Sequence, residues 1–319
     1  MSAPRVALVG AGSMGRNHAR IMAENPDAHL VAIVDPFESS GAPLAHTYGA
    51  EWIADVDDLK DVDAVVVAAS TEHHFDLATR IVSRGLPLLI EKPVCPSLAQ
   101  TVEILSLSEK HGTPLMCGFL ERYNPAVMAA MRMVDGPLYA RADRHSPYAP
   151  RIKTGVAWDL LVHDVDLLSQ LFGGGEPTQI NVEVGQFHPD SVPGAEDVID
   201  VSLRFPSGGI ASASASRLGQ RKVRSLLIQT LESMVEVDLL RRGVTLYRHT
   251  TVSEDRAGGA GYRQATEMEV PEITGREPLA TQFSRFLDLI AGRIDMDDER
   301  RSILPAHQIV DRALGGRPA

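Results

Sequence analysis

The chain has 319 residues and a formal net charge of −11, with 44% apolar and 23% charged residues. This is an ordinary soluble globular composition, long enough for two domains. The acidic balance argues against general nucleic-acid binding, and the longest apolar runs are too short to span a bilayer. Cys95 and Cys117 lack metal or redox spacing, and no signal peptide is evident, so we expect reduced, buried thiols in a cytoplasmic protein.

The first third of the chain alternates apolar strands with amphipathic helices. Strands are predicted in RVALVG, HLVAIVD, DAVVVAAS, LPLLIEKP and TPLMCGFL, and helices in SMGRNHARIMAEN, HFDLATRIVSRG and SLAQTVEILSLSEKHG. Apolar strands separated by such helices indicate a parallel sheet covered on both faces. We therefore predict a doubly wound α/β domain over residues 1–121.

From about residue 137 the pattern changes to alternation with a period of two. It is seen in QINVEVGQF, DVIDVSLRF, GIASASASR, VRSLLIQT, SMVEVDLL and GVTLYRH. Such strands have one solvated face, which predicts an α+β domain with a large open mixed sheet over residues 122–319. A helix over 158–171 is expected to cover that sheet, residues 253–264 are interpreted as a mobile loop, and two helices close the chain.

The first strand is followed by the run GAGSMG, in which Gly10, Gly12 and Gly15 have the spacing G-x-G-x-x-G. The run opens a helix, and Asp35 stands 20 residues beyond Gly15 at the end of the next strand. This context is the fingerprint of a dinucleotide-binding Rossmann fold. The amides of Ser13 and Met14 would meet the pyrophosphate at the helix start. Asp35 would accept hydrogen bonds from the ribose hydroxyls and repel a 2′-phosphate, which favours NAD over NADP.

Glu91 and Lys92 directly follow a buried strand and precede Pro93. Ligands of open α/β sheets bind at the carboxyl ends of the strands, so Lys92 is either a charge at the rim or a donor to substrate. Pro93 is a candidate for a cis peptide bond that would fix the direction of the lysine.

The run WDLLVHDVDLL at residues 158–168 places ionisable groups among apolar ones. On a regular helix Asp159, His163 and Asp166 share one stripe, with Asp164 outside it. Such a stripe should face something that repays its desolvation. A water-filled crevice would explain Asp164 but not the stripe. A metal site is disfavoured, because one helix supplies two or three ligands and no thiolate is near.

Together, GAGSMGRNHAR, EKP and DLLVHDVDLL make the chain resemble the GFO/IDH/MocA oxidoreductases over essentially its whole length. The resemblance implies a Rossmann domain, a larger open-sheet domain, and a substrate bound between them. It implies that Lys92, Asp159 and His163 are catalytic. His163 would be the base for a substrate hydroxyl, and Lys92 would donate to the same oxygen. The cofactor would contact Gly10, Gly12, Ser13, Met14, Gly15, Asp35, Ser70, His74, Glu91 and Lys92.

The substrate is suggested by a basic segment in an acidic protein. Residues 132–153 hold five basic residues against two acidic ones, which favours an anionic ligand, although a solvated basic strand explains the charge equally well. The runs GFLERYNPAV and SPYAPRIKTGVAWDLL resemble the UDP-N-acetylglucosamine 3-dehydrogenase branch of the family. That branch oxidises the C3 hydroxyl of the sugar with NAD. The resemblance implies that the substrate contacts Arg122, Tyr123, Asn124, Arg151 and His163.

Two alternatives stay open. One is a dehydrogenase of inositol or another sugar or polyol, or a sugar 3-ketoreductase. The other is a non-catalytic NAD-binding regulator, which would have no need of Lys92, Asp159 and His163 together. A homodimer or homotetramer is expected, because an open sheet face commonly pairs. We expect no metal, no nucleic acid and no membrane partner.

Overall fold

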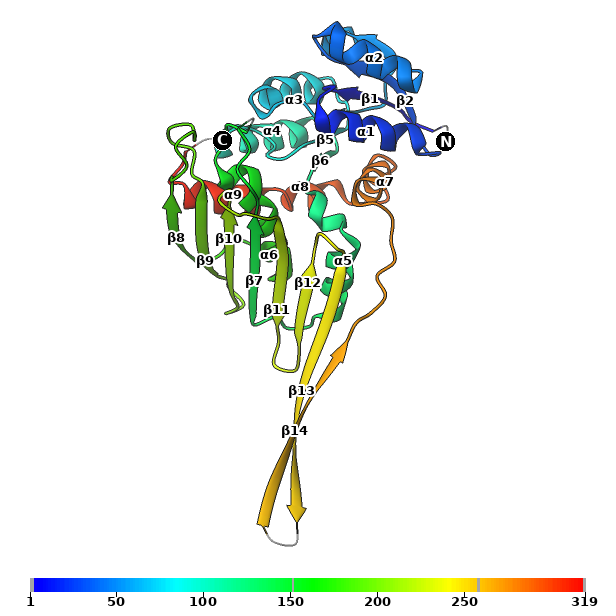
Figure 1. Ribbon diagram of the computed structural model, residues 1–319. Coiled ribbons are helices and arrows are strands. Elements are labelled where there is room, and N and C mark those ends of the chain that lie inside the picture. The colour runs from blue at the N-terminus through cyan, green and yellow to red at the C-terminus, as the bar shows by residue number, and fades with distance from the viewer. Residues whose placement is uncertain (1–2, 151, 257–258, 318–319) are drawn as a thin grey trace. The chain divides into compact units, whose positions relative to one another are not determined.

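The computed structural model describes residues 3–150, 152–256 and 259–317, without the side chains of 252–256 and 259–263. It divides the chain into two compact units (Figure 1). Unit 1 comprises Met1–Tyr123 with Arg276–Ala319, and unit 2 comprises Asn124–Gly275.

Unit 1 contains a six-stranded parallel sheet in the order β3-β2-β1-β4-β5-β6. The central strands are buried on both faces, as predicted for a doubly wound fold. The strands are β1 (Arg5–Val9), β2 (His29–Val34), β3 (Glu51–Ile53), β4 (Ala64–Val67), β5 (Leu88–Ile90) and β6 (Leu115–Cys117). Its helices are α1 (Ser13–Glu24), α2 (Glu38–Tyr48), α3 (His74–Ser83), α4 (Leu98–His111), α7 (Pro278–Ile290), α8 (Met296–Arg301) and α9 (Leu304–Ala313), with single turns η1 (Val56–Asp58), η2 (Thr71–His73) and η3 (Leu120–Tyr123).

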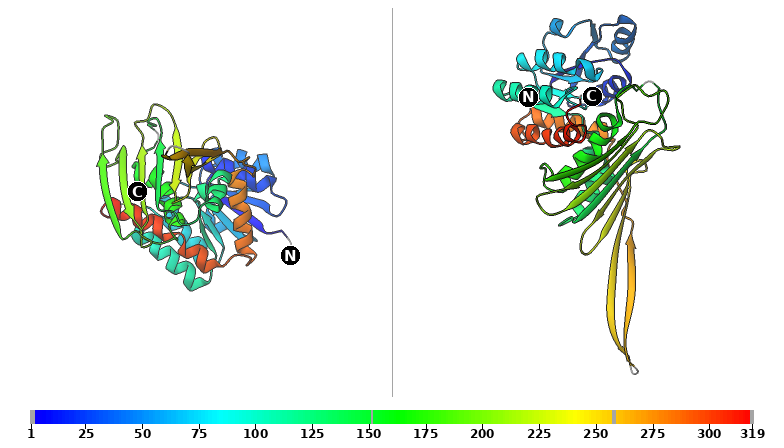
Figure 2. Two further views of the ribbon diagram at one scale, coloured as in Figure 1. Left: turned by 90° about the horizontal axis from the view of Figure 1, so that it is seen from below. Right: turned by 90° about the vertical axis from the view of Figure 1, so that its left-hand side faces the viewer.

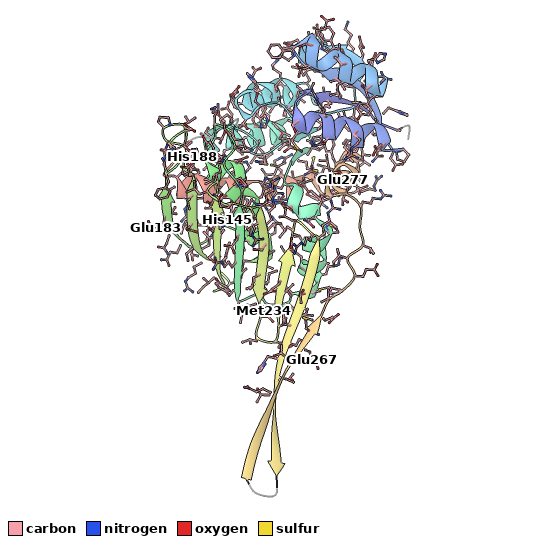
Figure 3. The ribbon with its side chains drawn as sticks, viewed as in Figure 1. His145, Glu183, His188, Met234, Glu267 and Glu277 are labelled. Atoms are coloured by element: carbon pink, nitrogen blue, oxygen red, sulfur yellow. The ribbon has the colours of Figure 1, made fainter. Side chains whose placement is uncertain are left out.

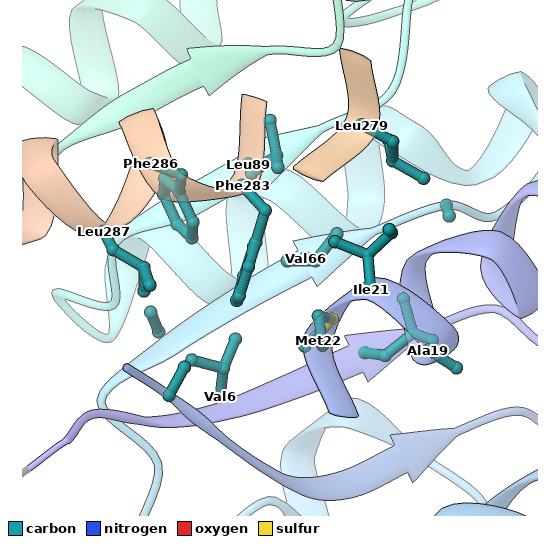
Figure 4. Close-up of a cluster of buried hydrophobic side chains, with 14 of the residues drawn as sticks. Val6, Ala19, Ile21, Met22, Val66, Leu89, Leu279, Phe283, Phe286 and Leu287 are labelled. Atoms are coloured by element: carbon teal, nitrogen blue, oxygen red, sulfur yellow. The ribbon is translucent and has the colours of Figure 1, made fainter. Parts of the chain in front are cut away.

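The C-terminal helices belong to unit 1, whereas the sequence pattern placed residues 276–319 with the second domain. The cause is an apolar face on α7. Phe283 and Phe286 are fully buried in one cluster with Met22 of α1 and Val66 of β4 (Figure 4). Burial of such side chains contributes roughly 2–3 kcal/mol each, which favours α7 against α1 despite the long separation in sequence.

Unit 2 is built on an eight-stranded sheet in the order β14-β13-β12-β11-β7-β10-β9-β8. Neighbours are antiparallel except β10 and β7, which confirms the predicted mixed sheet. The strands are β7 (Tyr139–His145), β8 (Gln179–Gly185), β9 (Val198–Arg204), β10 (Ile210–Ser216), β11 (Val223–Gln229), β12 (Met234–Asp238), β13 (Gly243–Arg256) and β14 (Gly259–Glu269). The helices are α5 (Pro125–Met133) and α6 (Val162–Leu171), and α6 continues the π-helical turn η4 (Ala157–Leu161).

The two faces of this sheet differ. α5 packs on β12 and β13, while η4 and α6 pack on β7 and β10 (Figure 2). The face beneath them is a buried apolar row that runs through Val201, Ala213, Ala142, Leu226, Val237 and Val244. The other face carries polar and charged side chains, among them His145 (Figure 3). The ring of His145 lies 3.0 Å from the Ser214 Oγ. Within the described residues of unit 2, no helix packs on this open face.

The interpretation of residues 253–264 as a loop is wrong for 253–256 and 259–264, which are strand, while residues 257 and 258 lie outside the described residues. β13 and β14 form an antiparallel ladder from Leu246↔Glu269 to Arg256↔Gly259, and the hairpin extends past its neighbouring strands (Figure 1). The stretch is rich in glycine, which weakens a strand pattern. Cross-strand pairing between β13 and β14 overrides that local signal.

A buried ion pair fixes α6 to the sheet. The guanidinium of Arg144 on β7 donates to both carboxylate oxygens of Asp164 at 2.7 and 2.8 Å. Both side chains are at most 4% exposed. Asp164 lies outside the predicted stripe, and a water-filled crevice is not needed to explain it, because this two-pronged contact compensates its desolvation.

Removing one partner of this pair should be far more damaging than removing both. We expect Asp164→Ala to lower the free energy of unfolding by roughly 3–5 kcal/mol, because Arg144 would remain buried without compensation. The double variant Arg144→Met/Asp164→Leu should recover most of that loss. Urea unfolding gives the free energy of unfolding of the wild type, of Asp164→Ala and of the double variant. The control is Arg141→Met, which removes an exposed ion pair with Asp143. Equal losses in Asp164→Ala and the control would contradict this account.

Candidate functional site

The glycine-rich turn after β1 has the geometry its spacing predicted. Gly10 has φ +100°, and a Cβ there would lie 2.7 Å from the Ala68 carbonyl oxygen. A Cβ on Gly15 would lie 1.9 Å from the Gly10 oxygen, so only glycine allows α1 to approach this closely. No described atom lies within 4 Å of a Cβ built on Gly12. The turn is therefore closed where helix and strand meet and open at Gly12.

Asp35 follows β2 and faces this turn. One carboxylate oxygen accepts from the Ala11 amide at 2.8 Å, and the other accepts from the Phe37 amide at 3.0 Å. Its carbonyl oxygen accepts from the indole of Trp52 on β3 at 3.0 Å. The carboxylate is thus fixed on both sides, and each oxygen keeps further lone pairs for a hydroxyl donor.

A cavity of about 520 Å³ lies over these groups. Its lining includes Gly10, Gly12, Asp35 and Ser70, and on its far side His73 and Arg80. Arg80 is held by carboxylates, with an Asp57 oxygen at 2.7 Å and an Asp76 oxygen at 3.3 Å. Ser13 and Met14 are the first two residues of α1, so their amides belong to the helix N-terminus. An open Gly12, a helix start and a fixed acceptor at Asp35 fit a dinucleotide.

Lys92 lies at the end of the neighbouring strand β5 and is half-buried. Its peptide bond to Pro93 is cis, as anticipated. Glu91 contacts the ring of His18 on α1, with 2.9 Å between Oε1 and Nε2. Burial alone would raise the pKa of Glu91, but the hydrogen bond and charge of His18 outweigh it and hold that pKa below the usual range. Glu91 is therefore a carboxylate that accepts from His18.

Two more histidines, His74 and His307, contact the residues that follow Lys92. His74 is 1% exposed, and its ring nitrogens lie 2.8 Å from the Pro93 oxygen and 3.1 Å from the Ala69 oxygen. His307 on α9 accepts from the Val94 amide at 3.0 Å, and its Nδ1 donates to the Ile303 oxygen. Burial lowers the pKa of His74, and it lowers the pKa of His307 to about 4. The His307 ring is neutral at pH 7, with one nitrogen that accepts and one that donates.

In unit 2 the predicted stripe is altered by the π-helical turn. Asp159 lies in η4 and His163 in α6, and both are half-buried, whereas Asp166 is 1% exposed. The wider turn changes the angle between Asp159 and the two residues that follow it in the stripe. His163 and Asp166 both lie in the regular part of the helix, and of these two only Asp166 is buried. Asp159 accepts from the guanidinium of Arg217 at 3.1 Å, and the Arg217 side chain is only 4% exposed.

The start of η4 is fixed by a second carboxylate. Glu196 accepts from the Ala157 amide at 2.7 Å, and its own carbonyl oxygen accepts from the Val156 amide. A Cβ at Gly155 would lie 2.2 Å from the Glu196 carboxylate. Glu196 therefore satisfies a free amide at the start of the helix that carries Asp159 and His163.

The predicted substrate contacts lie in several environments. Arg122 donates to the side-chain and carbonyl oxygens of Ser302 at 2.8 Å each and lies over the Phe119 ring. Tyr123 is buried in the apolar cluster of unit 1. Asn124 caps α5 and donates to the Leu239 oxygen. Arg151 lies outside the described residues. The predicted catalytic set is divided, with Lys92 in unit 1 and Asp159 and His163 in unit 2.

Two of the five basic residues in the segment 132–153 are paired with carboxylates. Arg144 forms the buried pair with Asp164, and Arg141 pairs with Asp143 at 3.0 Å. Arg132 and Lys153 are exposed. Charge in this segment thus supports an anionic substrate less than the sequence suggested.

Comparison with known proteins finds a family model that matches the N-terminal part of the chain and another that matches much of the remainder. Residues 4–119 match a model described as an oxidoreductase family with an NAD-binding Rossmann fold. Residues 127–232 match the GFO/IDH/MocA C-terminal domain. The chain belongs to the GFO/IDH/MocA oxidoreductase family. It is therefore an NAD-binding oxidoreductase, and the predicted fold class is confirmed.

Relatives within this family differ in substrate. An inositol 2-dehydrogenase from Rhizobium meliloti is 26% identical over 97% of this chain and 96% of its own length. A UDP-N-acetylglucosamine 3-dehydrogenase from Acidithiobacillus ferrooxidans is 27% identical over 90% of this chain and 88% of its own length. A solved structure of the latter covers 98% of this chain and 99% of its own, with a TM-score of 0.83 and 27% identity.

Other site types find little support in the described part of the chain. No group of three or more His, Cys, Asp or Glu side chains there is arranged to hold a metal ion. None of the helices described has both the length and the apolarity needed to cross a membrane. Cys95 and Cys117 are buried free thiols.

Sequence reasoning missed His18, Arg217 and His307. Each acts on a residue far away in the sequence, such as Glu91, which is 73 positions from His18. His18 does lie in the quoted run GAGSMGRNHAR, at the spacing that puts it on the first turns of α1, so its position was a usable signal. Nothing local marks Arg217 or His307.

The neutral state of His307 predicts an acid-sensitive stability. The unfolded chain protonates this ring near pH 6.5, whereas the folded protein does so only near its pKa of about 4. Its contribution is therefore intact above pH 6.5 and is lost as the pH falls towards 4, by up to roughly 3 kcal/mol. We expect His307→Gln to lose less stability than wild type between pH 7 and pH 5, measured by urea unfolding. An unchanged pH dependence in this variant would contradict the assigned neutral state.

Proposed function

We propose that this protein is an NAD-dependent dehydrogenase that oxidises a CH–OH group of a sugar or polyol. The observation that carries the proposal is the cavity formed by Gly12 and Asp35, at the same sheet edge as Lys92. Family membership supplies the reaction type, and Asp159 with His163 supplies an acid–base pair in the second unit.

Each residue has a distinct role in this proposal. NAD, when bound, accepts a hydride from the substrate carbon. His163 takes the hydroxyl proton, since a neutral imidazole is suited to that transfer. Lys92 donates to the same oxygen and stabilises its developing negative charge. Asp159, kept in place by Arg217, orients the substrate or the imidazole. A non-catalytic regulator would not need this combination.

A preference for NAD over NADP is part of the proposal. The Asp35 carboxylate is fixed by two amides at the cavity wall, so it cannot swing away from a 2′-phosphate without losing both hydrogen bonds. Repulsion between the Asp35 carboxylate and the 2′-phosphate would weaken the binding of NADP.

The proposed substrate is a nucleotide sugar oxidised at C3. Similarity to the UDP-N-acetylglucosamine 3-dehydrogenase supports it, together with the runs around Arg122 and Arg151. The inositol dehydrogenase of comparable identity supports the alternative, a polyol substrate. We also propose that the protein acts in the cytoplasm and self-associates through the open face of the unit 2 sheet.

Removing the amine of Lys92 should abolish most of the turnover. We expect Lys92→Ala to lower kcat by several hundred-fold, since one donor to a developing oxyanion contributes roughly 3 kcal/mol. NADH affinity should stay within about threefold, because the fingerprint contacts persist. Lys110→Ala, an exposed lysine on α4, is the matched control. Near-normal turnover of Lys92→Ala would refute its role.

A side-by-side assay of NADH formation identifies the substrate. We expect kcat/KM for UDP-N-acetylglucosamine to exceed that for free N-acetylglucosamine by about a hundredfold or more. The reason is that charge-assisted bonds from Arg122 and Arg151 to the diphosphate would contribute roughly 1.5–3 kcal/mol each. Myo-inositol and glucose serve as neutral comparisons. A comparable rate with myo-inositol would reject the nucleotide sugar while leaving the dehydrogenase intact.

A further inference from the structure

Three buried histidines from three different helices contact the backbone or side chain of residues flanking Lys92. His18 comes from α1, His74 from α3 and His307 from α9, and each is at most 1% exposed. Their targets are Glu91, Pro93 and Val94. The residue before Lys92 and the two residues after it are thus all held by imidazole rings within unit 1.

The contact between His18 and Glu91 fixes the residue that precedes Lys92 in the chain. The His18 Nε2 lies 2.9 Å from one Glu91 oxygen, and the other oxygen faces the Lys92 amide at 3.3 Å. A Cβ at Gly118 would lie 2.9 Å from that second oxygen, so the chain beyond β6 limits where the carboxylate can move. Glu91 therefore links α1 to the backbone of Lys92.

The contacts to Pro93 and Val94 fix the two residues that follow Lys92, one through a carbonyl oxygen and the other through an amide. Pro93 offers a carbonyl oxygen to Nδ1 of His74 at 2.8 Å, and a neutral ring can donate to it. The Val94 amide donates to Nε2 of His307 at 3.0 Å, while the opposite nitrogen of that ring is held by the Ile303 oxygen. Both groups are buried, so losing either ring would leave a backbone polar group unsatisfied.

We propose that His18, His74 and His307 are positioning residues that fix the direction of the Lys92 amine. This inference rests on the proposed function, which gives that amine a task. The positioning role requires no contact of His18 or His307 with substrate or cofactor. For His74, which the family resemblance places among the cofactor contacts, the positioning role is an additional one. Because a displacement of about 1 Å can cost about a hundredfold in rate, a rigid backbone on both sides of a single catalytic amine has a direct benefit.

The test observes Lys92 itself, with and without turnover. The chain has five lysines, at 60, 92, 110, 153 and 222, so lysine labelled with ¹³C at Cε gives five proton–carbon NMR signals. Lys92→Arg assigns its own signal. His307→Leu removes the acceptor for the Val94 amide, and His307→Gln restores an acceptor near the same position. Ser108→Ala is the control, since it removes buried hydrogen bonds to the Thr113 oxygen and from the Arg300 guanidinium and leaves residues 91–94 untouched.

We expect the Lys92 signal to shift in His307→Leu, to return towards wild type in His307→Gln, and to stay unmoved in Ser108→Ala. With substrate, kcat should fall about tenfold or more in the leucine variant, while the Kd for NADH stays within about twofold. If the leucine variant fails to fold, His18→Leu with His18→Gln takes its place, since the glutamine amide restores a donor near Nε2.

The two possible failures are distinguishable. A folded leucine variant with an unmoved Lys92 signal and unchanged kcat would overturn the positioning role, even if its melting temperature fell. If the Lys92 signal shifts in His307→Leu but the wild-type protein oxidises no sugar or polyol, the positioning role of the histidines stands and the proposed function is rejected.

Discussion

Parallel pairing of β1 with β2 and β4, and of β4 with β5, places the residues that follow these strands at one edge of the sheet. Gly10, Asp35, Ser70 and Lys92 all stand just beyond strand ends that this pairing aligns. The close approach of Gly15 to Gly10 then brings the start of α1 to the same edge. The nucleotide cavity depends on this alignment, since its lining comes from segments far apart in sequence.

Unit 2 positions its polar groups by a different means. Its sheet is apolar beneath η4 and α6, so each charge there requires a partner. Asp164 has Arg144, Asp159 has Arg217, and the helix start has Glu196. The first pair is fully buried and anchors the helix. The Asp159 side chain keeps 24% of its surface exposed, in contrast to the buried Asp164.

Much of the site was predictable from local sequence. The glycine spacing and Asp35 act within one strand–turn–helix unit, so spacing alone predicts their geometry. The place of Asp159 in the stripe was not predictable, because a π-helical turn breaks the regular spacing between it and His163. The place of α7 and the partners of Glu91 and Val94 depend on packing between distant segments, which local patterns do not encode. Arg144 shows the same limit, since its charge suggested a ligand and its burial reveals an anchor.

The central claim is that hydride moves from a substrate carbon to NAD on this protein. Incubation with NAD and a mixture of UDP-N-acetylglucosamine and myo-inositol, each deuterated at its ring carbons, tests it directly. Mass spectrometry of the cofactor should find reduced NAD that carries one deuterium. Absence of reduced cofactor, or reduced cofactor without deuterium, would contradict the claim.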